Sequence, residues 1–146
     1  MSAESIALDR VLELAVVLND DMTSSLARAG LTVARAHLLW ELRRRGPMTQ
    51  QALAAAMAVS PRNVTGLVDG LVGSGFVTRE PHPTDRRATL VTCTERGSQT
   101  AEMLASGQQE LAQTLFASMA EPDLRCFTAG LDHVLRLLRD ATGDLR

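Results

Sequence analysis

Two adjacent arginines, Arg86 and Arg87, end a turn-forming stretch of the chain, PHPTDRR, just before an alternating run, ATLVTCT. A guanidinium is a permanent cation whose planar fork of donors suits phosphate oxygens and base edges. A turn with a strand on each side would hold this pair rigidly enough to be inserted into a partner. The simpler alternative is a solvated turn in which Asp85 pairs with Arg87 and nothing else follows.

The arginines are concentrated in the middle of the chain. Residues 28–96 hold ten arginines and five acidic residues, although the 146-residue chain as a whole has a net charge of −2. A basic middle between acidic flanks is typical of a protein that binds a polyanion with one region only. The alternating runs on either side of the turn predict a β-hairpin, with the arginine pair at its tip.

Other chemistry is not indicated by the sequence. The glycines at positions 66, 70, 73 and 75 lack the spacing of a nucleotide-binding loop, and we find no nucleophile motif or paired carboxylates. His82 and His133 are isolated, so no metal site is expected. Cys93 and Cys126 are expected to be small buried apolar residues. We therefore expect no enzyme and no cofactor, and the lack of a long apolar run or signal segment predicts a cytoplasmic protein without membrane contact.

Capping residues indicate the helices that precede the hairpin. Thr49 is suited to cap a short helix, TQQALAAAM, and Ser60 with Pro61 is a strong start signal for a second helix, which glycines end near residue 73. Two helices joined by a short turn and followed by a hairpin form a winged helix-turn-helix. In that arrangement the second helix enters the DNA major groove and the hairpin tip lies along the flanking backbone or minor groove.

This arrangement gives the polar residues specific expected roles. The candidate contacts of the second helix are Ser60, Pro61, Arg62, Asn63 and Thr65. Arg62 can bind guanine, Asn63 can bind adenine, and Thr65 suits a phosphate or a thymine methyl group. Thr49 and Gln50 are candidate phosphate anchors at the start of the preceding helix. In the wing, Asp85 would hold Arg87 extended into the minor groove while Arg86 binds a phosphate.

Helices are also predicted on both sides of this region. Apolar residues recur at helical spacing from Ile6 to Leu26, and the last segment has apolar steps of three and four residues that resemble a coiled-coil seam. A monomer would leave that seam poorly covered. The candidate dimer-interface residues are Val11, Leu14, Leu18, Leu124, Phe127, Leu131, Val134 and Leu138. We predict a dimerisation helix at 1–30, the winged helix-turn-helix at 31–97 and further dimerisation helices at 98–146, within one compact domain.

The run from Ala52 to Gly97 resembles the helix-turn-helix and wing of MarR-type transcriptional regulators. Asp85-x-Arg87 followed by Cys93-Thr94 is similar to the wing signature of that family, with Cys93 in place of the usual leucine. The resemblance covers residues 31–97 well and the flanking helices only in position and pattern. It implies a mostly α (α+β) fold and a homodimeric, ligand-responsive repressor that binds a pseudo-palindromic operator in double-stranded DNA.

The resemblance also implies an effector pocket between the dimerisation and DNA-binding parts, for a small lipophilic or phenolic compound. His37 and Trp40, one helical turn apart, lie near its expected opening, although core or dimer packing is the favoured explanation for both. Gly66 and Gly70 depart from the family, whose members often carry arginine or another long polar residue there. They would either let the DNA backbone approach closely or leave fewer phosphate contacts. The alternative function is a dimeric winged-helix module that binds a protein partner without specific DNA recognition.

Overall fold

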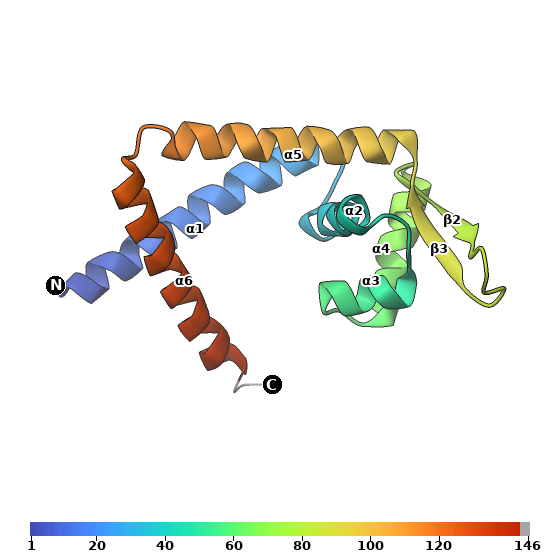
Figure 1. Cartoon of the computed structure of the whole chain (residues 1–146), viewed down its shortest axis with the longest axis horizontal. Helices are drawn as coiled ribbons and strands as arrows, with labels where there is room; N and C mark the ends of the chain where they lie inside the picture. Colours follow the sequence, from blue (N-terminus) through green and yellow to red (C-terminus); the bar gives the residue numbers. More distant parts are fainter. Residues whose placement is uncertain (144–146) are drawn as a thin grey trace. The chain divides into compact units, whose positions relative to one another are not determined.

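The computed structural model describes residues 1–143 of the chain. These residues form two compact units, Met1–Leu104 and a second unit that begins at Ala105. Figure 1 shows the first unit as helices gathered beside a projecting hairpin. The boundary between the two units lies within a helix, residues 95–116. The division into dimerisation and DNA-binding regions at residues 30 and 97 stays a prediction. Within residues 1–143, every helix is too short or too polar to span a lipid bilayer.

The first unit contains the winged helix-turn-helix. Its elements are α1 (Ala3–Arg28), α2 (Val33–Arg45), β1 (Met48–Thr49), α3 (Gln50–Met57), α4 (Pro61–Gly73), β2 (Val77–Pro81), β3 (Thr89–Cys93) and the first part of α5 (Glu95–Phe116). Every helix and both long strands expected from the sequence are present. The fold is therefore mostly helical with one small antiparallel sheet, as predicted.

The predicted caps define the helix-turn-helix. Thr49 Oγ1 accepts a hydrogen bond from the Ala52 N–H at 3.1 Å and starts α3, and Ser60 Oγ accepts one from the Asn63 N–H at 3.1 Å and starts α4. Each bond satisfies an amide that has no partner within its own helix. Between the two helices, Ala58 ends α3 with a left-handed backbone, φ 54°. Three residues, 58–60, therefore connect the two helices.

The sheet has three strands rather than the predicted two, in the order β1-β3-β2. The hairpin strands pair antiparallel, with Val77 opposite Cys93 and Pro81 opposite Thr89. The added strand, β1, is only two residues long, and Met48 pairs with Val91. A two-residue strand shows no alternation in the sequence. Because β1 directly precedes α3, its pairing with β3 attaches the start of α3 to the hairpin.

A single apolar core holds these elements together. The largest fully buried side chains are Phe76, Leu38, Leu39, Leu53, Leu71, Val64, Val68, Val77 and Val91, which come from α2, α3, α4 and the sheet. The end of α1 contributes Leu26, but its other residues are exposed or half-buried. After the wing, Thr94 Oγ1 accepts from the Gly97 N–H at 3.1 Å and thereby caps the start of α5.

The second unit contains the rest of α5 and α6 (Glu121–Gly143). Its described residues include no buried side chain, and the rings of Phe116 and Phe127 lie 5.9 Å apart, centroid to centroid. The prediction that both cysteines are buried was wrong for Cys126, which is exposed, whereas Cys93 is half-buried. The spacing of apolar residues along a helix does not show which of its sides another element covers.

Candidate nucleic-acid interface

Helix α4 has one buried side and one exposed side. Val64, Val68 and Leu71 are buried in the core, whereas Arg62 and Asn63 in the first turn are exposed. Pro61 is the first helical residue and Ser60 the cap, so these two predicted contacts have the structural roles expected of them. The end of the helix that carries Arg62 and Asn63 is therefore accessible to a partner.

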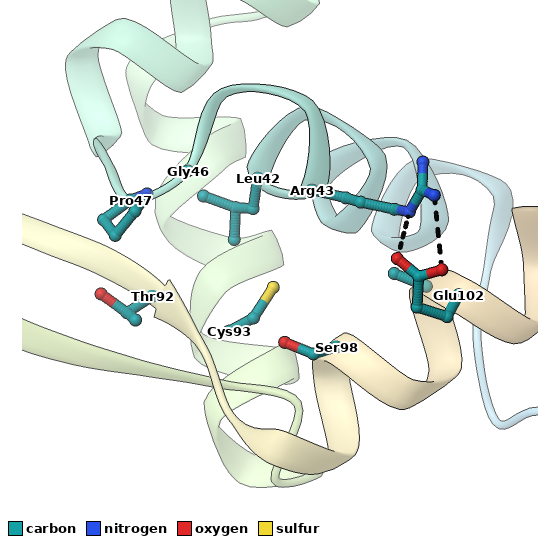
Figure 2. A pocket seen from close by; sticks show the side chains of 9 residues that line it. Leu42, Arg43, Gly46, Pro47, Thr92, Cys93, Ser98 and Glu102 are labelled. Carbon is teal, nitrogen blue, oxygen red and sulfur yellow. Dashed lines mark hydrogen bonds and ion pairs between the residues drawn. The ribbon is translucent and has the colours of Figure 1, made fainter.

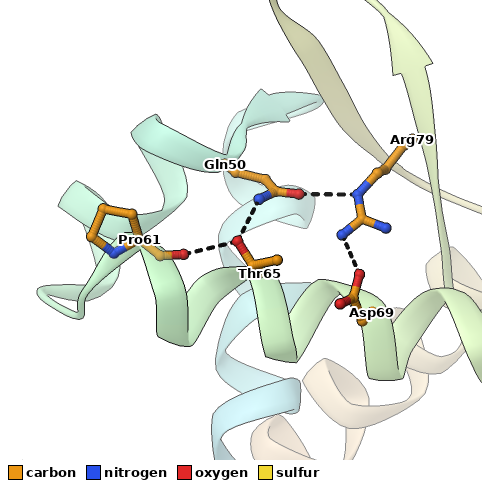
Figure 3. A network of polar contacts seen from close by, with 5 residues as sticks. All are labelled: Gln50, Pro61, Thr65, Asp69 and Arg79. Atoms are coloured by element: carbon orange, nitrogen blue, oxygen red, sulfur yellow. Dashed lines mark hydrogen bonds and ion pairs between the residues drawn. The ribbon is translucent and has the colours of Figure 1, made fainter.

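A polar network ties the exposed side of α4 to α3 and to the wing (Figure 3). The Gln50 side-chain amide donates to Thr65 Oγ1 at 3.0 Å, and Thr65 in turn donates to the Pro61 carbonyl at 3.0 Å. Arg79 of β2 donates through Nε to Gln50 Oε1 at 3.0 Å and through an Nη to Asp69 at 2.5 Å. Gln50 and Thr65 are therefore held in place by the protein itself.

Arg79 is the residue of this site that the sequence analysis missed. Its partners lie ten and twenty-nine residues away, in α4 and α3. A planar guanidinium can donate to two different groups at once and hold them in fixed relative positions. Arg79 thus joins the first hairpin strand to both helices of the helix-turn-helix. The only sequence signal was an arginine on the outward side of a strand, which alone is also typical of a solvated surface.

The wing tip is built by side chains that accept hydrogen bonds from the backbone. Nδ1 of His82 accepts from the N–H groups of Thr84 and Asp85 at 3.2 and 3.0 Å. Asp85 Oδ1 accepts from the Arg87 N–H at 2.9 Å, a local turn bond. Asp85 therefore orders the backbone of the turn, and it forms no ion pair with the Arg87 guanidinium among the described residues. Arg86 and Arg87 are both exposed.

The arginines of residues 28–96 fall into two groups. Six of them have polar partners: Arg43 pairs with Glu102, Arg44 and Arg45 with Glu41, and Arg79 with Asp69, while Arg28 and Arg96 donate to Ser25 and the Ser74 carbonyl. Within residues 1–143, the guanidinium groups of Arg35, Arg62, Arg86 and Arg87 have none. The positive charge left for a partner is thus much more localised than the composition indicates.

A cavity of about 320 Å³ lies between α2, the sheet and the start of α5 (Figure 2). Its lining residues are Leu42, Arg43, Gly46, Pro47, Thr92, Cys93, Ser98, Ala101 and Glu102. Arg43 Nε donates to Glu102 at 2.8 Å, and this hydrogen bond lowers the pKa of Glu102 and raises that of Arg43. Burial raises the pKa of the Cys93 thiol. The cavity therefore has an ion pair on one wall and a protonated thiol on another.

The candidate pocket residues His37 and Trp40 do not line this cavity. His37 is largely exposed, and its Nε2 lies 3.5 Å from the buried carboxylate of Glu41. Trp40 is half-buried, and the Arg43 guanidinium lies over its ring, 5.5 Å from the centroid. Trp40 is thus separated from the cavity by one residue, the arginine that forms part of its wall.

The fold and the exposed α4 end define a winged helix-turn-helix protein. Residues 31–89 match the model of the MarR family. An uncharacterized HTH-type transcriptional regulator from Mycobacterium bovis is 28% identical over 111 residues, which cover 76% of this chain and 78% of that protein. The chain is thus similar to the MarR family of transcriptional regulators, and the matched segment contains both helices of the motif and the wing turn.

Two further comparisons point to the same motif, one in sequence and one in fold. The HTH-type transcriptional repressor MdtR from Bacillus subtilis is 24% identical over 126 residues, which cover 84% of this chain and 81% of MdtR. The structure of Streptococcus pneumoniae FabT in complex with DNA has the same fold, with a TM-score of 0.78 and 16% identity over 92% of this chain and 99% of that one.

Proposed function

We propose that the protein is a homodimeric, sequence-specific DNA-binding repressor that acts by binding and catalyses no reaction. The observation that carries this proposal is the placement of three arginines that have no polar partner among residues 1–143. Arg62 on α4 and Arg86 with Arg87 on the wing lie on elements joined by Arg79. A rigid frame with cations at two separate points suits a DNA duplex, which offers a groove and two phosphate backbones. Action on DNA would place the protein in the cytoplasm.

In this proposal the start of α4 enters the major groove. Arg62 and Asn63 are then the residues that read base edges, because both are exposed in the first helical turn. The wing would follow the backbone, with Arg87 in the minor groove and Arg86 on a phosphate. Thr49 and Gln50 use their side chains within the protein, so their part in phosphate binding falls to the backbone amides at the start of α3.

The proposed dimer is supported by apolar side chains that the single chain leaves uncovered. On α6, Phe127, Val134 and Leu138 are 38 to 53% exposed, and on α1, Leu14 and Leu18 are 41 and 37% exposed. Monomeric proteins rarely leave long apolar stripes open to water. A two-fold dimer through these helices would present two α4 helices to half-sites about one turn of DNA apart. The operator would then be a pseudo-palindrome.

The proposed ligand response is supported by the cavity beside the wing. Thr92 and Cys93 belong to β3, and Ser98 belongs to α5, so a small lipophilic or phenolic compound bound there would contact the root of the wing. It could release DNA only by binding more tightly to a conformation that fits the operator poorly. Trp40, the single tryptophan, stacks with Arg43 of the cavity wall, so its fluorescence should change when a compound enters.

The first experiment is fluorescence anisotropy with the DNA upstream of the protein's own gene and with scrambled DNA, each in a salt series. The natural site should bind at least about a thousandfold more tightly. Arg86→Ala/Arg87→Ala should weaken binding and flatten the salt dependence, because two contacts that release counterions are lost. The matched control is Arg10→Ala/Arg125→Ala, which removes the same charge from two arginines that pair with acids on terminal helices.

The competing function is a dimeric module that binds a protein partner. It predicts that natural and scrambled DNA bind alike, weakly and with strong salt sensitivity. Equal binding of the two DNAs by a dimeric, folded protein would therefore replace the repressor proposal with the partner-binding one.

A further inference from the structure

Arg35 of α2 lies directly against the recognition helix at Gly70. A Cβ atom on residue 70 would be 2.6 Å from Cζ and 2.9 Å from Nε of Arg35, and it would also overlap an Nη nitrogen. Bonded neighbours aside, carbon atoms normally stay about 3.5 Å or more from other heavy atoms. The guanidinium therefore occupies space that only a glycine at position 70 leaves free.

Arg35 is also badly placed for the stability of its own helix. Thr32 caps α2 and accepts from the Arg35 N–H, so Arg35 is the third residue of the helix. This position favours glutamate or glutamine, because the start of a helix carries partial positive charge. A cation there slightly destabilises the helix rather than stabilising it. Its guanidinium has no acidic partner within residues 1–143, so no ion pair offsets that cost.

The contact places Arg35 on the side of α4 that begins with Asn63. Gly70 follows Asn63 by seven residues and Gly66 by four, so the three positions share one helix face. A Cβ added at Gly66 would meet no atom within 4 Å. The helix surface at Gly66, between Asn63 and Gly70, is thus open, and Arg35 itself is half-buried. A DNA backbone that follows this side of α4 would meet no side chain at Gly66 on its way to the partly exposed Arg35.

We propose that Arg35 is a DNA-contacting residue that binds a backbone phosphate from α2, and that Gly70 is present to admit its side chain. This inference rests on the proposed DNA-binding function. It gives Gly70 a specific role: the recognition helix lacks a long side chain at position 70, and a second helix would supply the cation there. Arg35 thus joins Arg62, Arg86 and Arg87 as the fourth arginine available to DNA.

The first test is Arg35→Ala in the same anisotropy salt series. Loss of one phosphate contact should weaken binding about tenfold and reduce the slope of log K against log salt by about 0.9. The loss should be equal on natural and scrambled DNA, because phosphates carry no base sequence. Arg10→Ala is the matched control for loss of charge. Thermal unfolding should be unchanged or raised, because the variant removes an unfavourable cation from the start of α2.

The second test changes the glycine and keeps the arginine. Gly70→Ala should push the guanidinium away from α4 and weaken DNA binding to the level of Arg35→Ala, while the fold becomes more stable because alanine favours helix. Gly73→Ala, in the same helix with no atom within 4 Å of the added carbon, is the control and should bind DNA normally. In Arg35→Ala/Gly70→Ala the two losses should not add, because both remove the same contact.

Each outcome separates this inference from the repressor proposal. If the wild type prefers its natural site and Arg35→Ala leaves both affinity and salt slope unchanged, the Arg35 assignment is overturned and the repressor stands. If the wild type has no preference but Arg35→Ala still flattens the slope, the repressor proposal fails and the phosphate contact stands. A wild type without any DNA binding overturns both. Additive losses in the double variant would overturn the stated role of Gly70.

Discussion

The two compact units of this chain differ in what they do with their apolar residues. Residues 1–104 bury a core centred on Phe76, Leu38 and Leu53, whereas the described part of residues 105–146 buries no side chain. Helix α1 resembles the second unit, because Leu26 is its single buried residue. The winged helix-turn-helix thus contains its own apolar core, whereas the exposed apolar side chains of the terminal helices are left for the proposed dimer to cover.

The largest test of this contrast places a charge on the apolar side of α6. We expect Val134→Asp to dissociate the dimer and to lower DNA affinity by more than a hundredfold, because one subunit then binds a half-site alone. Analytical ultracentrifugation gives the assembly state and anisotropy gives the affinity. Ala129→Asp, on the opposite side of α6, is the control and should remain dimeric. A dimeric Val134→Asp protein would remove α6 from the interface.

A second prediction compares leucines from the two regions. Leu53→Ala, in the core, should lower the free energy of unfolding by about 2–5 kcal/mol. Leu138→Ala should have an effect that depends on protein concentration, because a subunit interface stabilises by mass action. Urea unfolding at two protein concentrations measures both effects. A Leu138→Ala loss that is the same at both concentrations would contradict the idea that a partner covers this residue.

A third prediction uses glycines from both parts of α5. A Cβ on Gly97 would overlap the carbonyl oxygen of Phe76, whereas one on Gly107 would meet no atom within 4 Å. Gly97→Ala should therefore destabilise the protein by about 1–3 kcal/mol through forced backbone movement. Gly107→Ala should stabilise it by up to about 1 kcal/mol through helix propensity. Changes of the same sign in thermal unfolding would mean that Gly107 is packed against something in the assembled protein.

The smallest effect is expected at the Arg43–Glu102 pair, near the end of the first unit. The arginine lowers the folded pKa of Glu102 below its ordinary value of 4.5. A lowered carboxyl pKa stabilises the fold above the unfolded value, and this contribution is lost as the pH falls through the folded pKa. Glu102→Gln should slightly reduce stability at neutral pH and remove that part of the loss below pH 4.5. Parallel melting curves from pH 7 to 3 test this expectation.

Local signals made most of the fold predictable. The caps Thr49 and Ser60, the proline at position 61 and the alternation of the wing strands each act within a few residues, and the structure contains all four features. Strand β1 was not predictable, because its two residues pair with a partner about forty positions later in the chain. Burial at Cys126 was predicted wrongly for a related reason, since helix periodicity does not say what covers each side.

The candidate site was predictable to a smaller extent. The sequence indicated the start of α4 and the wing tip, whose residues are consecutive. It did not indicate Arg79, which joins three elements, or the contact between Arg35 and Gly70, which depends on how α2 crosses α4. Gly66 and Gly70, which both lack the long side chain found in many family members, have different surroundings in the structure. One leaves open space, and the other accommodates an arginine from elsewhere.

The two cysteines give the protein a built-in pair of chemical reporters. Cys126 is exposed, whereas Cys93 is half-buried in the cavity wall with a raised pKa. The thiolate is the form that attacks an alkylating reagent, so Cys126 should be modified first and Cys93 slowly. In a mass-spectrometry time course, the rate of modification at Cys126 would serve as the internal reference for the rate at Cys93. A compound in the cavity would then be detected as a delay at Cys93, without any introduced label.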